Sequence, residues 1–392
     1  MDDQKITILK GPDRVRRRPT VVFLSDGIEG VQCAVHSIIK IFATEAQQQR
    51  CAWLKVVHSG TQLEFSGDDR GFYLGQDTDS DDVWQNLFCQ LYAAAAFAPT
   101  TSEAALDLTD DPNGFYYGKQ PADEYRSLEM YAFQCVCKYL EVISVRDGYE
   151  STLRFEKGYN IGGLQKKPSA APCGTTFRFE PDPEVFTETQ LPEAYFREML
   201  EAFALLIPGF HCTYINGAGE ATDYVYPKGM TDYIGQHSSE PVYHSNMWAK
   251  GRERYNSAEY TAYLEVAVGF TPNAGLVRCY HNLEELPCGG THMEQLQKRL
   301  HEVFDLCCRK ELTGLTSGEL AKHLTVILAT RCAPAVTAWV NGTRKSIKNR
   351  LITDMAQDAI DEAFENGLYQ NKTLCQSLVK AVLTDRKGEK KK

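Results

Sequence analysis

Residues that could take part in catalysis gather in one stretch, HSIIKIFATEA, at positions 36–46. His36 and Glu45 are the side chains there that could serve as a general base. The Ser37 hydroxyl cannot accept a proton near neutral pH without a base of its own, and Ile41 offers no oxygen to a hard cation such as Mg²⁺. Because a single histidine beside an apolar helix face is usually a packed or surface residue, we expect packing at His36.

The cysteines give little support for a metal centre. The chain has 13 cysteines but no C-x-x-C pair, and the only close spacings are Cys135-x-Cys137 and Cys307-Cys308. A zinc site or a disulfide framework normally needs paired spacings. We therefore expect scattered, mostly buried free thiols in a reducing compartment, and no metal site.

Composition and charge narrow the function classes. The chain has 392 residues, 43% hydrophobic and 24% charged, with a formal net charge of -10. This acidic balance predicts weak or no DNA binding, although basic clusters occur at 14–19 and 343–350, and we expect the basic tail 385–392 to be solvated and disordered. The apolar runs 202–210 and 262–270 are too short to span a membrane, and the N-terminus lacks a signal peptide. We expect a cytoplasmic protein without membrane association.

Apolar periodicity and turn residues predict an α+β protein of two domains, 1–230 and 231–392. Gly60-Thr61 is expected to join two strands as a hairpin. The expected strands are 7–10, 21–25, 54–59, 62–66, 140–148, 150–158, 175–182, 259–270, 276–282 and 323–331. The expected helices are centred on 36–46, 82–97, 127–140, 193–207, 292–310 and two closing helices within 351–383, with a long acidic loop at 98–124.

Four short motifs occur in an informative order. They are GPDRVRRRP (11–19), RDG (146–148), CGTTFRFEPDPEVF (173–186) and GGTH (289–292), the last lying between the strand LVRCYHN and a long helix. In this order the chain resembles the N-terminal fragment of gyrase B and of its topoisomerase IV counterpart. The resemblance implies a GHKL-type layered α/β ATPase domain followed by a transducer domain of the ribosomal S5 type.

The resemblance also locates the family's catalytic helix, E-x-x-D-N-A-x-D-E-A, on residues 37–46. The catalytic glutamate then falls on Ser37, and the asparagine that binds magnesium falls on Ile41. His36 could replace the base only if the register slips by one residue.

The family motif D-x-G-x-G corresponds to Gly67-Asp68-Asp69-Arg70-Gly71, where only Gly71 keeps its identity. Asp68 could take the role of the adenine-binding aspartate after a slip of one residue, but the glycine spacing then fails. An acidic turn between a strand and a loop is the alternative that we favour. Thr175 occupies the position of the adenine-side threonine, so the remnant of the pocket consists of Gly67, Asp68, Gly71 and Thr175.

The phosphate-binding elements of the family have no counterpart here. The segment 123–135, which corresponds to its glycine-rich lid, contains no glycine and begins with Asp123-Glu124, and Ala96 replaces a lysine. Like charges near a polyphosphate are repulsive.

The transducer motifs are better retained. They comprise the four residues of the GGTH motif, Gly289, Gly290, Thr291 and His292, and part of a Q-T-K loop, represented by Thr343, Arg344 and Lys345. The same NGTRKS segment also has the composition of a simple turn.

These substitutions predict an inactive gyrase-B-like protein that needs no cofactor and acts as an interaction or regulatory module. A type II topoisomerase subunit, a second copy of itself and an unrelated complex remain open as partners. The alternative is a divergent ATPase module, using ATP and magnesium, of a split topoisomerase whose cleavage domain is encoded separately. A pocket recruited for an apolar ligand near Ile41, Phe65 and Phe72, and DNA binding through 343–350, are further alternatives.

Overall fold

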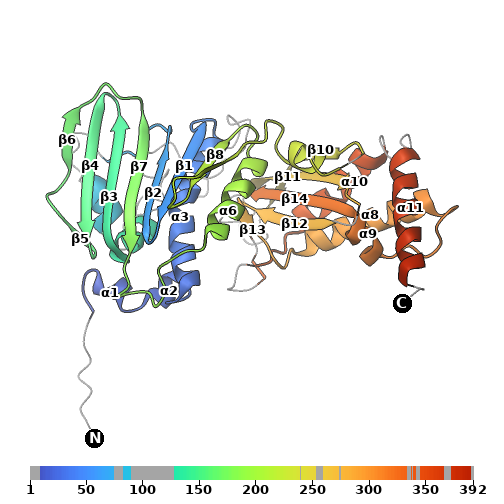
Figure 1. Ribbon diagram of the computed structural model, residues 1–392, viewed down its shortest axis with the longest axis horizontal. Coiled ribbons are helices and arrows are strands. Elements are labelled where there is room, and N and C mark those ends of the chain that lie inside the picture. Colours follow the sequence, from blue (N-terminus) through green and yellow to red (C-terminus); the bar gives the residue numbers. More distant parts are fainter. Residues whose placement is uncertain are drawn as a thin grey trace, which may run out of the picture. The chain divides into compact units, whose positions relative to one another are not determined.

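The computed structural model divides into two compact units, whose boundary in the chain falls between Val225 and Tyr226. The sequence placed this boundary at 230/231. The structure describes residues 9–74, 83–89, 128–238, 240–252, 259–272, 275–332, 337, 339–340, 345–365 and 372–389. The two units are described separately below, with the element labels of Figure 1.

The first unit contains a nine-stranded sheet with helices on one face (Figure 1). Its strands follow the order β5-β4-β3-β7-β2-β1-β8-β9, and β6 also pairs with β4. The strands are β1 (Trp53–Ser59), β2 (Gln62–Gly67), β3 (Cys137–Arg146), β4 (Tyr149–Glu156), β5 (Tyr159–Asn160), β6 (Gln165–Pro168), β7 (Gly174–Pro181), β8 (His211–Ile215) and β9 (Ala221–Tyr224). The helices are α1 (Asp13–Arg16), α2 (Pro19–Phe23), α3 (Ile28–Gln47), α4 (Val83–Cys89), α5 (Leu128–Cys135) and α6 (Glu193–Leu206).

The two faces of this sheet differ in chemistry because strand residues alternate between them. On the inner face, Phe65 of β2 contacts Phe179 of β7 and Phe196 of α6, with ring centroids 5.0 and 6.4 Å apart. On the outer face, Arg178 pairs with Glu64 at 2.7 Å and with Glu141 at 3.0 Å. The sheet therefore buries one face under helices, and charged pairs cover the other.

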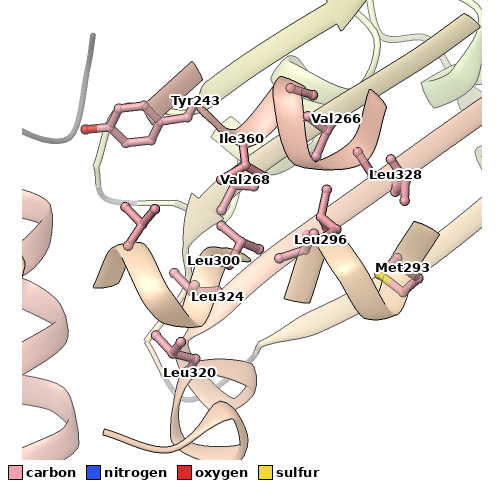
Figure 2. Packing of buried hydrophobic residues seen from close by; sticks show 14 of the residues in the cluster. Tyr243, Val266, Val268, Met293, Leu296, Leu300, Leu320, Leu324, Leu328 and Ile360 are labelled. Carbon is pink, nitrogen blue, oxygen red and sulfur yellow. The ribbon is translucent and has the colours of Figure 1, made fainter. Parts of the chain in front are cut away.

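The second unit is a five-stranded sheet of order β10-β11-β14-β12-β13, in which β12 and β14 run parallel. Its strands are β10 (Tyr243–Arg252), β11 (Glu259–Phe270), β12 (Leu276–His281), β13 (Glu284–Glu285) and β14 (Leu324–Cys332). Its helices are α7 (Met230–Gly235), α8 (Thr291–Cys308), α9 (Ser317–His323), α10 (Arg350–Glu365) and α11 (Lys372–Glu389). Figure 2 shows Leu296, Leu300 and Ile360 of α8 and α10 packed against the strands, and all three belong to the apolar core.

Most long elements match the sequence prediction, but three segments were predicted wrongly. The helix expected over 127–140 ends at Cys135, and strand β3 already begins at Cys137. Residues 21–25 were expected to be a strand, whereas residues up to Phe23 form α2, which begins with Pro19 in the first helical turn, where a proline is well tolerated. The tail 385–392 was expected to be disordered, whereas α11 continues to Glu389. Its Arg386 donates to Gly314 O at 2.8 Å and to Glu319 Oε2 at 3.0 Å. The predicted strand 7–10 lies largely outside the described residues, and Leu9 and Lys10 are not in a strand.

Candidate functional site

The predicted catalytic helix is α3, and its two degenerate positions offer no catalytic group. The Ser37 hydroxyl donates a hydrogen bond to the backbone oxygen of Ala34 at 2.7 Å, within the same helix. Ile41, one turn further on, is half-buried. The His36 ring packs at a tilt against Phe203 of α6, with the ring centroids 6.0 Å apart. The helix therefore presents neither a carboxylate base nor an amide ligand at these two positions.

Glu45 lies near the C-terminal end of α3, and its carboxylate binds two arginines. Arg50 binds it through two hydrogen bonds of 2.9 and 3.0 Å, and Arg70 adds a third of 3.2 Å. The residue is 3% exposed. A bidentate guanidinium pair fixes both oxygens. Glu45 therefore ties the C-terminal end of α3 to the loop after β2.

Gly67 has no room for a side chain because Phe42 lies against it. A Cβ atom on Gly67 would lie 2.7 Å from Phe42 Cδ1 and 3.0 Å from the backbone oxygen of Trp53. Real Cβ atoms essentially never approach another atom so closely. The family's adenine-binding aspartate, which falls on Gly67, could not be present together with this phenylalanine.

Phe42 is one end of a chain of aromatic contacts that runs from α3 over β7 to α4 and β4. The centroids of Phe42 and Phe177 are 6.0 Å apart, as are those of Phe177 and Phe72. The chain continues from Phe72 to Phe88 at 5.9 Å and from Phe88 to Phe155 at 5.3 Å. All five rings belong to residues at most 2% exposed. These rings therefore form a continuous aromatic cluster inside the first unit.

A buried carboxylate beside Thr175 is present, but it is Asp69 and not Asp68. Asp69 Oδ1 accepts hydrogen bonds from Thr175 Oγ1 at 2.8 Å and from the Gly71 amide at 2.6 Å. Burial raises the pKa of Asp69 to about 6, although both hydrogen bonds favour the ionised form. Asp68 instead accepts from the Ala52 and Trp53 amides at 2.8 and 2.9 Å, so it positions the start of β1.

The sequence contained a signal for Asp69 that the motif comparison missed. An aspartate that accepts from the amide two residues later forms an Asx turn. Gly71, the surviving glycine of the motif, has φ +77, a conformation that glycine adopts without strain. An Asp-x-Gly triplet at 69–71 fits this turn, whereas Asp68 has no glycine at that spacing.

The GGTH motif performs a packing role within the second unit. A Cβ on Gly290 would lie 2.2 Å from the backbone oxygen of Ile347, with which Gly290 forms a parallel bridge. Thr291 Oγ1 lies 2.7 Å from Thr353 Oγ1 of α10. The motif therefore joins the start of α8 to the segment that leads into α10. Gly289, the first residue of the motif, has a backbone φ of +56.

His292 and Cys279 form a buried pair with Nε2 and Sγ 3.1 Å apart. A cysteine beside a histidine can be a nucleophile when the thiolate is favoured. Here burial lowers the pKa of His292 to about 4 and raises that of Cys279 to about 12. Both groups are therefore neutral near pH 7, and the pair is structural.

Several predicted site residues cannot be placed. Ala96, Asp123 and Glu124 of the lid region, together with Thr343 and Arg344 of the transducer loop, lie outside the described residues. Lys345 is described: it is exposed, and its backbone oxygen accepts from the Cys288 amide at 3.2 Å. Over the described part of the chain, no group of three or more His, Cys, Asp or Glu side chains could hold a metal ion. None of the described helices is long and apolar enough to cross a membrane.

The two units have the architecture of a GHKL-type ATPase domain and a transducer domain, and the comparisons with known proteins agree. A family model described as DNA gyrase B matches residues 229–392. The gyrase B protein of Thermotoga maritima is 23% identical over 401 residues, covering 98% of this chain and 59% of the relative. The B chain of DNA topoisomerase 4 from Enterococcus faecalis is 21% identical over 405 residues, covering 99% and 55%.

Solved structures show the same fold. The 43K ATPase domain of Thermus thermophilus gyrase B, in complex with an aminocoumarin, matches with a TM-score of 0.67 at 17% identity, covering 98% of this chain and 97% of that chain. The gyrase B protein from Myxococcus xanthus matches with a TM-score of 0.67 at 16% identity, covering 94% and 99%. The chain therefore resembles the gyrase B N-terminal fragment throughout, and it spans between 55% and 59% of the length of the two curated relatives.

Proposed function

We propose that this protein is a catalytically inactive, gyrase-B-like pseudo-ATPase that acts as an interaction or regulatory module. The observation that carries the proposal is the position of Phe42. Its ring lies against Gly67, where the nucleotide-binding family has its adenine-binding aspartate. ATP could not enter without displacing a fully buried aromatic ring, which is costly in a close-packed interior.

The missing chemistry supports the same proposal. Ser37 and Ile41 replace the general base and the magnesium ligand, and the Ser37 hydroxyl is bonded within its own helix. Loss of a general base alone typically costs 10²–10⁴-fold in rate. With both groups replaced and the pocket filled, we expect no need for ATP or magnesium as cofactors.

The partner proposed is a topoisomerase subunit or a second copy of this chain. Both curated relatives are named as subunits, of DNA gyrase and of DNA topoisomerase 4. If the pocket is filled while the fold is kept, the surfaces of the fold are the parts that remain available for binding a partner. A cytoplasmic location and weak or absent DNA binding complete the proposal, because the net charge of -10 disfavours a phosphate-binding surface.

Asp69 favours one alternative, a divergent ATPase module of a split type II topoisomerase. Its buried carboxylate bonded to Thr175 is an acceptor that could be turned toward a ligand. This alternative needs Phe42 to move and needs a base, yet Glu45 is already held by three arginine hydrogen bonds. We therefore rank it second.

Three assays of the purified protein test the proposal. ATP hydrolysis with magnesium should equal the buffer blank, and Asp69→Asn should change nothing. Light scattering, alone and with a purified A-type topoisomerase subunit, should show a dimer or a complex. Magnesium-dependent hydrolysis that Asp69→Asn abolishes and the exposed substitution Asp223→Asn leaves intact would establish the alternative. Titration of a DNA duplex at two salt concentrations checks the expected weak binding.

A further inference from the structure

Three thiols meet in the second unit where α11 crosses α8. Cys307 and Cys308 end α8, and Cys375 lies in the first turn of α11. Cys308 belongs to the buried apolar core of the second unit. Cys307 and Cys375 are partly buried and pack against that core. Cys375 is within side-chain hydrogen-bonding reach of both neighbours, and Cys308 Sγ lies 4.0 Å from the Cys375 backbone oxygen.

This arrangement differs from that of other buried cysteines in the described chain. Cys279 is paired with an imidazole, and the Cys137 thiol donates to the Phe133 backbone oxygen at 3.2 Å. Burial raises the pKa of Cys279 to about 12 and that of Cys137 well above its usual value, so neither is a ready nucleophile. Cys308 and Cys375 instead share a side-chain hydrogen bond, which lowers the pKa of Cys308 and raises that of Cys375.

We propose that Cys308 and Cys375 form a redox-sensitive thiol pair, which a hydroperoxide converts to a disulfide between α8 and α11. In the first step the sulfur of one thiol of the pair attacks the peroxide, so that an S–O bond forms, the O–O bond breaks and the leaving hydroxide takes a proton. In the second step the other sulfur attacks the sulfenic sulfur, so that an S–S bond forms, the S–O bond breaks and the oxygen leaves as water. Two thiols lose two electrons and the peroxide is reduced to two waters.

The disulfide would fasten the N-terminal end of α11 covalently to α8. At the other end of the helix, Arg386 already donates to Glu319 and to the Thr313 and Gly314 backbone oxygens. Oxidation therefore ties both ends of α11 to the rest of the unit. Closing the chain between residues 308 and 375 restricts the unfolded state and should raise the thermal midpoint by roughly 5–10 °C.

The test treats reduced protein with hydrogen peroxide, blocks free thiols and digests with trypsin without reduction. The expected product joins peptide 300–309, which contains Cys307 and Cys308, to peptide 373–380, which contains Cys375. Cys308→Ala and Cys375→Ala should abolish the cross-link and the rise in thermal midpoint. Cys307→Ser and the exposed control Cys173→Ser should retain both.

Other results overturn the proposal. A cross-link that survives Cys308→Ala but not Cys307→Ser would assign the disulfide to Cys307. Oxidation that gives only sulfinic acids or links between molecules would show that the pair does not close. Because Cys308→Ala is a core substitution, its thermal midpoint in reductant confirms that the variant is folded, and Cys375→Ala at a half-buried position gives the same test independently.

Discussion

The ring of Phe42 lies so close to Gly67 that a Cβ atom at that position would be 2.7 Å from Phe42 Cδ1. The two residues therefore constrain each other: the phenylalanine on α3 requires glycine on β2, and an aspartate on β2 would require a smaller residue on α3. In the proposed inactive protein, this single steric relationship would account for loss of the nucleotide site together with retention of the fold.

This relationship predicts non-additive substitutions. Gly67→Asp should destabilise the protein by about 3 kcal/mol, since it overpacks the core and buries a carboxylate. Phe42→Ala should cost about 3–5 kcal/mol through the cavity it leaves. The double variant should lose less stability than the sum of the two single losses, because the cavity left by Phe42→Ala accommodates the new aspartate side chain. Urea unfolding of the four proteins measures the coupling, and strict additivity would show that the two positions do not compete for space.

Asp69 predicts a pH-dependent stability term. Its pKa is raised to about 6 in the folded protein, above its usual value, so the folded state binds more protons and stability falls as pH rises from about 4 to 6. The free energy of unfolding of wild type relative to Asp69→Asn should drop by about 2 kcal/mol between pH 4.5 and 7.

Asp223 serves as the control for this pH effect. Hydrogen bonds from Thr213 and His211 lower its pKa, so the stability that Asp223 contributes is lost only as pH falls below the usual carboxyl range. The stability difference between wild type and Asp223→Asn should therefore stay nearly constant between pH 4.5 and 7. Urea unfolding at both pH values measures each difference. An Asp69 difference that is the same at pH 4.5 and 7 would contradict the burial of that carboxylate.

The close packing of Gly290 predicts that the GGTH motif is needed for stability. Gly290→Ala places a Cβ 2.2 Å from the Ile347 backbone oxygen at φ +152 and should cost at least about 3 kcal/mol. The matched control is Gly318→Ala in α9, where a Cβ meets nothing within 4 Å. This variant should gain up to about 1 kcal/mol of stability, because alanine has a higher helix propensity than glycine. Denaturant unfolding of both variants measures the contrast, and equal stabilities would refute the packing role.

Arg386 predicts an ordered C-terminal helix. Its side chain is bonded to Glu319, whose pKa it lowers to about 2. Arg386→Ala should therefore speed amide hydrogen exchange over the last turns of α11, while the neighbouring Lys387→Ala, at an exposed position, should not. Rapid exchange over these turns in the wild-type protein would contradict the ordered helix and would support the disordered tail that the sequence predicted.

The sequence predicted those features that depend on long periodic patterns. The packing face of α3, the hairpin at Gly60-Thr61 and the α+β class were all evident from apolar spacing and turn residues. The strand expected at 21–25 failed because Pro19 starts a short helix there despite its β-branched residues. The motif comparison pointed to Asp68 and missed Asp69, since only the turn at Gly71 determines which of the two adjacent carboxylates points inward. The close contact of Phe42 with Gly67 joins positions 25 residues apart in the chain, and no local pattern reports it.

The central claim is that the pocket is filled and binds no nucleotide. Isothermal titration of the purified protein with a non-hydrolysable ATP analogue and magnesium tests it most directly. The account predicts no saturable heat up to millimolar ligand, for wild type and Asp69→Asn alike. Saturable binding at micromolar ligand that Asp69→Asn removes would contradict it, because Phe42 would then have to leave the position it occupies against Gly67.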